Sequence, residues 1–452
     1  MRGPALAWLG WAGESSPTPL GPFDAAGAWG SAVWALGQGV VASALALVLI
    51  GARVRGKRWA GPTALIVLSV DLMVANTGLV VTAPREAFET PPAVVRLIEE
   101  AERREPSPGP FRVHRLSTWF PPGGFGGPGV DPLRALTRWE LDTAKPRTAT
   151  RWGLSYTLAG GGLELAEYSA FLGGFYLPID LSKAPLRGAV DGQPVLYYTR
   201  RGYDLWGTRY FILPMEPNGW QDATRGVAAF LAGGDTLAPG PDLMTRPENA
   251  AKLDDYIRTQ DWMLLRNRAA FPRAWVVHRA RFEKPIGPGE ADRERRERVM
   301  EQILYPDDPI WSRPNMRLYD PHTLAWVETE DAKPLARFFP GPDPGSDSRE
   351  SVAVKRVDPT TVELEANLAR PGLVVLADVN YPGWTLRVDG KPAEVLRVNR
   401  LMRGAAVEAG THRLVYTYEP VWLLPCAAVS LAGVVATAVW GLAARSRPGP
   451  AA

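Results

Sequence analysis

Residues 380–420 read NYPGWTLRVDGKPAEVLRVNRLMRGAAVEAGTHRLVYTYEP, and residues 421–444 continue as VWLLPCAAVSLAGVVATAVWGLAA. The first stretch contains short runs in which apolar and polar residues alternate, a pattern typical of half-buried strands. Asp389-Gly390 between two such runs is a strong hairpin signal. The second stretch has no charged residue and is long enough for a helix that crosses a bilayer. The sequence therefore predicts a β-rich module joined directly to a membrane helix.

Two earlier stretches have the same length and apolar character. Residues 31–52 carry no charge, and residues 62–84 carry only Asp71. Both are rich in Gly and Ala, which let membrane helices approach each other closely. The alternative is a buried helix of a soluble protein, but such helices are shorter and usually have a polar stripe. We therefore predict three transmembrane helices, at 31–52, 62–84 and 421–444.

The short loops beside these helices indicate their orientation. Basic residues next to a membrane span tend to stay in the cytoplasm. We therefore expect the loop 53–61 and the tail 445–452 to be cytoplasmic, and the N-terminal segment 1–30 and the insert 85–420 to lie on the extracytoplasmic face. The loop could also contact anionic lipid headgroups, although its effect on orientation is sufficient to explain its four basic residues, which are Arg53, Arg55, Lys57 and Arg58.

Composition excludes some functional classes. The net charge is only +3 and charges of both signs are mixed along the insert, so a nucleic-acid-binding surface is not indicated. The single cysteine, Cys426, falls in the third predicted membrane helix. The insert therefore has no disulfides, and its stability must come from core packing.

The insert divides into two predicted parts. Strand-like and helix-like runs alternate over residues 85–345, which predicts a mixed α/β subdomain. The linker-like sequence GPDPGSDSRES follows at residues 341–351. Beyond it, six or seven short strand-like runs separated by turn signals predict an antiparallel β-sandwich over 346–420. Because these strands are contiguous in sequence, we expect this sandwich to fold independently. The overall prediction is a membrane-anchored α+β protein.

The tail contains a series of short motifs. They are Tyr381-Pro382-Gly383-Trp384, Val388-Asp389-Gly390, Arg403-Gly404, Ala409-Gly410 with His412, and Tyr418-Glu419-Pro420. With these motifs, the tail resembles the C-terminal end of the bacterial YfhO-type membrane proteins. Runs in the middle of the chain fit the same family in the expected order: SVDLMVAN, TRYFILP, FPRAWVVHRARF and DPHTLAWVE. Each of these runs is a weak signal by itself, whereas the motifs in the tail are fairly specific.

The resemblance implies a role in the cell envelope of a bacterium, with the chain in the cytoplasmic membrane. Members of the family resemble glycosyltransferases that use polyprenyl-phosphate sugars on the outer membrane face. Their many membrane helices and expected catalytic acid precede the region that this chain resembles. We therefore expect the chain to be inactive alone. It would be either the C-terminal half of a split enzyme, with a many-spanning membrane partner encoded upstream, or an accessory remnant of such an enzyme. The alternative is a non-catalytic anchored module that binds glycan or protein.

Polar residues inside the second predicted membrane helix are candidates for a site. An ionisable group at mid-membrane depth, such as Asp71, faces a bundle interior, a partner or water. Asp71 could belong to a site for lipid phosphate or a lipid-linked sugar that is shared with further helices. Asn76 could extend the polar patch, although it does not lie on the same face of the helix. The alternative, a hydrogen bond between helices, is favoured because a carboxylate is a poor partner for phosphate without a metal or a base.

Aromatic residues of the insert are candidates for a sugar-binding surface, because flat rings suit sugar rings as well as cores. Trp119 lies beside a Gly/Pro-rich loop and is the best candidate for an exposed platform, with Trp206 and Trp220 as further candidates. Trp384 begins a predicted strand and is expected to fill the sandwich core. None of the four histidines has metal-ligand spacing, so we expect no metal. No Gly-x-Ser-x-Gly, P-loop or dinucleotide-binding motif is present, so we expect no cofactor and no catalytic residue.

Overall fold

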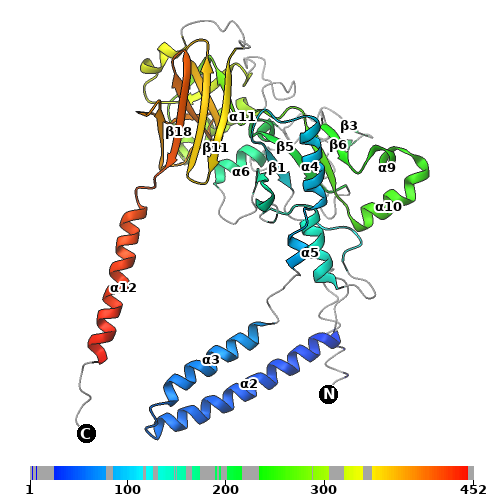
Figure 1. Ribbon diagram of the computed structural model, residues 1–452, viewed down its shortest axis with the longest axis vertical. Helices are drawn as coiled ribbons and strands as arrows, with labels where there is room; N and C mark the ends of the chain where they lie inside the picture. Colours follow the sequence, from blue (N-terminus) through cyan, green and yellow to red (C-terminus); the bar gives the residue numbers. More distant parts are fainter. Residues whose placement is uncertain are drawn as a thin grey trace.

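The computed structural model contains helices and several β-sheets, with a folded body from which three long helices extend (Figure 1). Short 3₁₀ helices are labelled η. The structure describes residues 3, 7, 25–77, 85–115, 119–125, 131–146, 148, 150–158, 165–173, 189–190, 193–194, 201–215, 234–287, 289–304, 320–339 and 349–445.

The three apolar stretches of the sequence form helices. By length and composition, α2 (Ala25–Val54) and α12 (Leu423–Arg445) could each cross a membrane. The second stretch forms α3 (Ala60–Asn76), which has 17 residues. Residues 78–84, the remainder of the second predicted span, lie outside the described residues. α2 and α3 lie side by side and are joined by the turn that carries the basic residues (Figure 1).

A five-stranded mixed sheet organises the first part of the insert. Its strand order is β2-β1-β5-β7-β6, with β1 parallel to both of its neighbours. Helix α4 (Ala93–Arg104) buries Val94, Val95 and Ile98 in a core shared with this sheet. The strands are β1 (Arg112–Arg115), β2 (Ser155–Tyr156), β5 (Thr208–Leu213), β6 (Gly234–Ala238) and β7 (Met263–Asn267).

Two further sheets face each other as a β-sandwich. Apolar residues from both sheets, such as Leu364 of β12 and Val374 of β13, form one core between them. The first sheet has the order β11-β12-β18-β14-β15, with β11 (Ser351–Asp358), β12 (Thr361–Leu368), β14 (Trp384–Val388), β15 (Lys391–Ala393) and β18 (Gly410–Tyr418). The second has the order β8-β13-β17-β16-β10-β9, with β8 (Ala274–Val277), β9 (Arg279–Glu283), β10 (Leu324–Glu328), β13 (Gly372–Val379), β16 (Leu396–Val398) and β17 (Met402–Val407).

The predicted boundary at residue 346 does not separate this sandwich from the rest of the chain. Strands β8, β9 and β10 precede residue 346, yet they make up half of the six-stranded sheet. Val375 of β13 lies opposite Trp275 of β8, and β16 pairs with β10. The prediction of a self-contained sandwich is therefore wrong, because its edges are completed by strands from the preceding segment.

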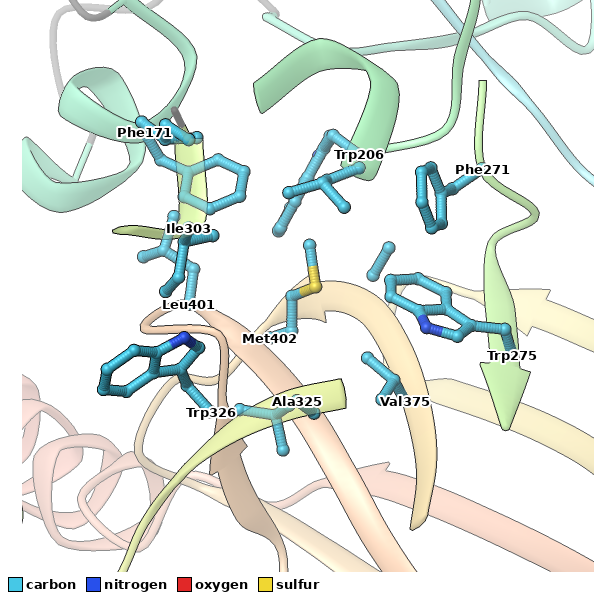
Figure 2. Packing of buried hydrophobic residues seen from close by; sticks show 14 of the residues in the cluster. Phe171, Trp206, Phe271, Trp275, Ile303, Ala325, Trp326, Val375, Leu401 and Met402 are labelled. Carbon is cyan, nitrogen blue, oxygen red and sulfur yellow. The ribbon is translucent and has the colours of Figure 1, made fainter. Parts of the chain in front are cut away.

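A second core covers the outer face of the six-stranded sheet. Met402 of β17 points toward Trp206, which lies with Phe271 above the sheet (Figure 2). Ile303 of α11 (Arg293–Leu304) and Phe171 of α6 (Ala166–Gly173) complete this layer. The α/β part and the sandwich are thus joined by a continuous apolar core.

Local sequence signals mark two of the remaining elements. Asp131 caps α5 (Pro132–Asp142) by accepting hydrogen bonds from the amides of Leu133 and Arg134. Asp389 and Gly390 both have positive φ and connect β14 to β15 as a tight hairpin. The other elements are η2 (Arg85–Phe88), η3 (Thr150–Trp152), β3 (Ala189–Val190), β4 (Gln193–Pro194), α7 (Arg201–Leu205), α9 (Pro241–Thr245), η4 (Pro247–Asn249), α10 (Ala250–Thr259), η5 (Glu290–Asp292) and η6 (Lys333–Phe338).

A fragment of residues 349–420 is expected not to fold by itself. It leaves β13 and β16 without their partners β8 and β10, and it exposes the apolar face of β13 and β17 that packs on Trp206 and Phe271. Thermal unfolding of this fragment, followed by circular dichroism, should show no cooperative transition, whereas a fragment of residues 85–420 should melt cooperatively. A cooperative transition in the short fragment would contradict the sheet pairing.

Candidate functional site

A cleft with a volume of about 770 Å³ lies where the sheet containing β1 and β2 meets the sandwich. Charged, aromatic and apolar side chains from both parts line it. The charged residues are Arg112, Arg273, Arg403, Asp358 and Asp378; the aromatic residues are Tyr156, Tyr168, Trp206, Tyr381 and Trp384; the others are Thr157, Leu165, Val357, Pro359, Val362 and Val379.

A cluster of three arginines around one carboxylate dominates the chemistry of the cleft. Asp378 accepts hydrogen bonds from Arg112, from Arg273 at 2.9 and 3.2 Å, and from Arg403 at 3.1 Å. All four side chains are at most 10% exposed. Three guanidinium groups against one carboxylate leave two positive charges in excess. A buried charge is costly unless an opposite charge compensates it.

Irregular strand geometry brings these residues together. A shift in the register of β13 against β17 falls between Leu376 and Val379, so Asp378 lies in a bulge. Bulges re-aim side chains, often beside functional sites. The carbonyl of Arg273, just before β8, accepts a hydrogen bond from the amide of Ala377 at 2.9 Å and holds Arg273 beside the bulge. The strand ends thus position the cluster.

Arg112 comes from the five-stranded sheet of the first part of the insert, not from the sandwich. Arg112 opens β1, and its Nη1 donates to the carbonyl oxygen of Trp206 at 2.6 Å. Its amide donates to the carbonyl of Gly207, where φ is +70°. A left-handed backbone at this position favours glycine. The contact between Arg112 and Asp378 therefore joins the α/β part to the sandwich.

Aromatic rings lie against two of the guanidinium groups. The guanidinium carbon of Arg403 is 3.8 Å from the centre of the Trp384 ring, and that of Arg112 is 5.0 Å from the centre of the Trp206 ring. Such stacking stabilises a cation electrostatically. It does not supply hydrogen-bond acceptors. Within the described residues, Nε of Arg273 and both Nε and Nη1 of Arg403 are buried without a partner.

The protonation states follow from these surroundings. Burial alone would raise the pKa of Asp378, but attraction to Arg112, Arg273 and Arg403 outweighs it and lowers that pKa below its ordinary value. Burial lowers the pKa of Arg403, and the neighbouring Asp378 opposes this effect. Asp378 is therefore ionised at neutral pH and is a weak base. Asp358, the other carboxylate of the cleft, pairs with Arg356.

The rim of the cleft lies at the end of the sandwich from which α12 departs. Trp384 is opposite Tyr418, the last residue of β18, and their rings are 5.3 Å apart. Glu419 donates its amide to the carbonyl oxygen of Gly383 at 2.6 Å. The turn between β11 and β12 lies at the same end, because Thr361 is opposite Thr417. The cleft is therefore within a few residues of the start of α12.

A second buried ionic cluster lies away from this cleft. Arg400 has a fully buried side chain and donates to Glu328 at 2.5 Å and to Glu167 at 2.6 Å. Arg397 also contacts Glu167, and Glu328 accepts a further hydrogen bond from the amide of Ile286. Charges of opposite sign balance in this cluster, so it serves to hold β10, β16 and α6 together.

Histidines do not form a metal centre in the described part of the chain, where no group of three or more potential ligands lies close together. His114 is buried beside Arg115; burial is the main reason that its pKa falls from 6.5 to about 3. It is therefore neutral at physiological pH. His278 contacts the carbonyl oxygen of Pro371 and the carboxylate of Glu350.

The two predicted polar residues of the second apolar stretch, Asp71 and Asn76, each form a hydrogen bond within the pair of helices α2 and α3. Gln38 of α2 donates to the Asp71 carboxylate at 2.8 Å and to its backbone carbonyl at 3.0 Å. This is the interhelical hydrogen bond that the sequence favoured. Asn76 donates to the carbonyl of Leu72 in its own helix. The basic residues at 53, 55, 57 and 58 are exposed at the end of α2 and in the turn that follows.

The predicted tryptophan platform is not exposed. Trp119 is 8% exposed and donates from its indole nitrogen to the carbonyl oxygen of Asp261 at 2.8 Å. The Arg115 guanidinium lies over its ring at 4.3 Å, and the Trp139 ring meets it edge to face. The prediction of an exposed surface at Trp119 is therefore wrong, because its ring packs in the core with Phe125 and Trp139.

The other tryptophans have different environments. Trp206 is buried but lines the cleft, and Trp220 lies outside the described residues. Trp384 is half-buried; it packs against the sandwich core, as expected, and also lines the cleft. Sequence reasoning missed the arginine cluster. Its only sequence signal was a set of charged residues inside strand-like runs, in RVHR, PRAWVV, VVLADV and MRGAAV.

No family model, no curated protein and no solved structure matches this chain. We therefore infer the function of the chain from the chemistry of the cleft and from the position of the cleft in the fold.

Proposed function

We propose that the chain is a membrane-anchored, non-catalytic binding module on the extracytoplasmic face of a bacterial cytoplasmic membrane, whose binding site is the arginine-lined cleft. We further propose that it acts as the C-terminal portion of a YfhO-like protein linked to polyprenyl-phosphate-sugar-dependent glycosylation of cell-envelope polymers. The observation that carries the binding role is the excess of two positive charges beside the aromatic rings of the cleft.

The lining of the cleft favours a ligand that combines a ring with negative charge. Exposed faces of aromatic side chains suit sugar rings, and arginines hold phosphates and carboxylates through charge-assisted hydrogen bonds. The volume of about 770 Å³ falls in the usual range for small-molecule sites. An acidic glycan or a lipid-linked sugar fits this description.

Within the part of the chain that the structure describes, the carboxylates of the cleft are engaged by arginine, which supports binding rather than transfer. Sugar transfer requires a group that deprotonates the acceptor. Both carboxylates that line the cleft, Asp358 and Asp378, are paired with arginine, and Asp378 has a lowered pKa. The proposed many-spanning partner would supply the base and the donor groove.

Orientation is the first testable part of the proposal. A cysteine introduced near residue 390, in the exposed turn after β14, is expected to react with an impermeant thiol reagent in intact spheroplasts, because the basic loop between α2 and α3 is proposed to stay cytoplasmic. The background variant carries Cys426→Ser. Labelling that appears only after lysis would contradict the proposed orientation.

Ligand binding in the cleft is the second testable part of the proposal. Titration of the full chain in neutral micelles with a hexose 1-phosphate should give saturable heat, whereas the uncharged hexose should bind more weakly by about tenfold or more. Arg273→Gln should reduce the affinity for the hexose phosphate by a similar factor. The control is Arg387→Gln, at an exposed position on the far end of β14. Equal weak binding of both probes by all variants would refute the binding role.

A further inference from the structure

The cleft and the start of α12 are held together by short, specific contacts. Four residues, 419–422, separate β18 from α12. Within them, Glu419 is hydrogen-bonded to Gly383. A side chain at Gly383 would meet Tyr418 at 3.0 Å and Pro420 at 3.3 Å. Glycine at residue 383 thus permits the close approach that brings Trp384 and the rim of the cleft to the α12 junction.

Apolar side chains are exposed at this rim. Val357 is 39% exposed, Tyr381 is 41% exposed and Leu165 is 41% exposed, and all three line the cleft. Nearby along the chain, Trp422, the residue immediately before α12, is 54% exposed. Tyr and Trp are enriched where a membrane protein meets the headgroup region. If α12 crosses a membrane, the rim lies at the level of that interface.

The charge of the cluster complements a membrane-borne anion. Arg112, Arg273 and Arg403 exceed Asp378 by two charges, while Asp358 is already neutralised by Arg356. Some N–H donors of the arginine cluster are buried. The positive charge of the cluster still acts on the cleft, because electrostatic attraction is weakly screened in a partly desolvated site.

We propose that the cleft binds the phosphate headgroup of an anionic phospholipid in the outer leaflet, with the arginine cluster facing the phosphate and the apolar rim facing the adjoining acyl region. This proposal rests on the proposed function, because it identifies the negatively charged ligand of the same cleft and requires α12 to be a membrane anchor. It explains why apolar side chains are exposed beside a charged pocket, which a fully water-soluble anion would not require.

Native mass spectrometry of the full chain in neutral micelles tests this proposal. The probes are a short-chain phosphatidylglycerol, the matching phosphatidylcholine and free sn-glycerol 3-phosphate. The wild type is expected to retain one phosphatidylglycerol about tenfold or more better than phosphatidylcholine. It should also retain phosphatidylglycerol better than glycerol phosphate. Arg273→Gln should remove the preference for phosphatidylglycerol, and Arg387→Gln should preserve it.

A rim variant separates the lipid from a free anion without altering the buried cluster. In Val357→Ser/Tyr381→Ser, both changed residues are exposed, so folding is expected to survive. This variant should lose affinity for phosphatidylglycerol by a much larger factor than for glycerol phosphate. An unaltered lipid affinity would overturn the lipid assignment.

Two further outcomes distinguish failure of the lipid proposal from failure of the proposed binding function. If hexose phosphate binds through Arg273 but phosphatidylglycerol is retained no better than phosphatidylcholine, the lipid proposal fails and the binding role stands. If no anionic probe depends on Arg273, the cluster is only a link between the two parts of the fold, and both proposals fail.

Discussion

Replacement of Asp378 by Asn is expected to lower the free energy of unfolding by about 3–5 kcal/mol. The substitution preserves shape but leaves Arg112, Arg273 and Arg403 buried around a neutral amide. Urea denaturation of the full chain in neutral micelles, followed by tryptophan emission, measures the loss. Asp358→Asn is the matched control. Its partner Arg356 is largely exposed, and exposed ion pairs contribute about 1 kcal/mol or less. Equal losses in the two variants would contradict the account of the cluster.

The same carboxylate gives a pH dependence of known sign. Because the folded-state pKa of Asp378 is lowered, its stabilising effect is complete above its unfolded pKa of about 4 and is lost as the pH falls through the folded value. The wild type should therefore lose stability on acidification below about pH 4. The Asp378→Asn variant should lack this component and approach the wild type at low pH. A constant difference between them at every pH would contradict the assigned ionisation.

Arg400→Met is expected to destabilise the fold by a similar amount, about 3–5 kcal/mol. Arg400 is fully buried and bridges Glu328 to Glu167. Methionine retains much of its volume but leaves the buried Glu328 carboxylate without that arginine. Addition of Glu328→Leu should recover part of the loss, since apolar replacement of both partners removes the uncompensated charge. Urea denaturation gives the three values, and a double variant less stable than Arg400→Met would contradict the explanation.

Local sequence patterns predicted the elements of the tail but not their partners. Alternation in VELEANL and the Asp389-Gly390 signal gave β12 and the β14–β15 hairpin, because these signals depend on nearby residues. The boundary at residue 346 failed for the opposite reason. Pairing of β13 with β8 joins residues about a hundred positions apart, and periodicity does not encode which strand edges meet.

Similar limits applied elsewhere in the chain. The local pattern of residues 246–268 by itself predicts one long helix. The segment instead forms α10 and then β7, since the buried apolar residues Met263, Leu264 and Leu265 suit a strand between β5 and β6. The arginine cluster was missed because Arg112 and Asp378 are 266 residues apart in sequence. Each of these residues looked like a polar position in a half-buried strand.

We propose that the cleft binds an anionic ligand at the membrane surface. Hydrogen exchange of the full chain in nanodiscs measures this binding in place, with a comparison of pure phosphatidylcholine and added phosphatidylglycerol. The anionic lipid is expected to slow exchange in the β11–β12 turn and at residues 380–384, and Arg273→Gln is expected to abolish this effect. Unchanged exchange in these two segments, or equal slowing in the Arg273→Gln variant, would contradict this proposal.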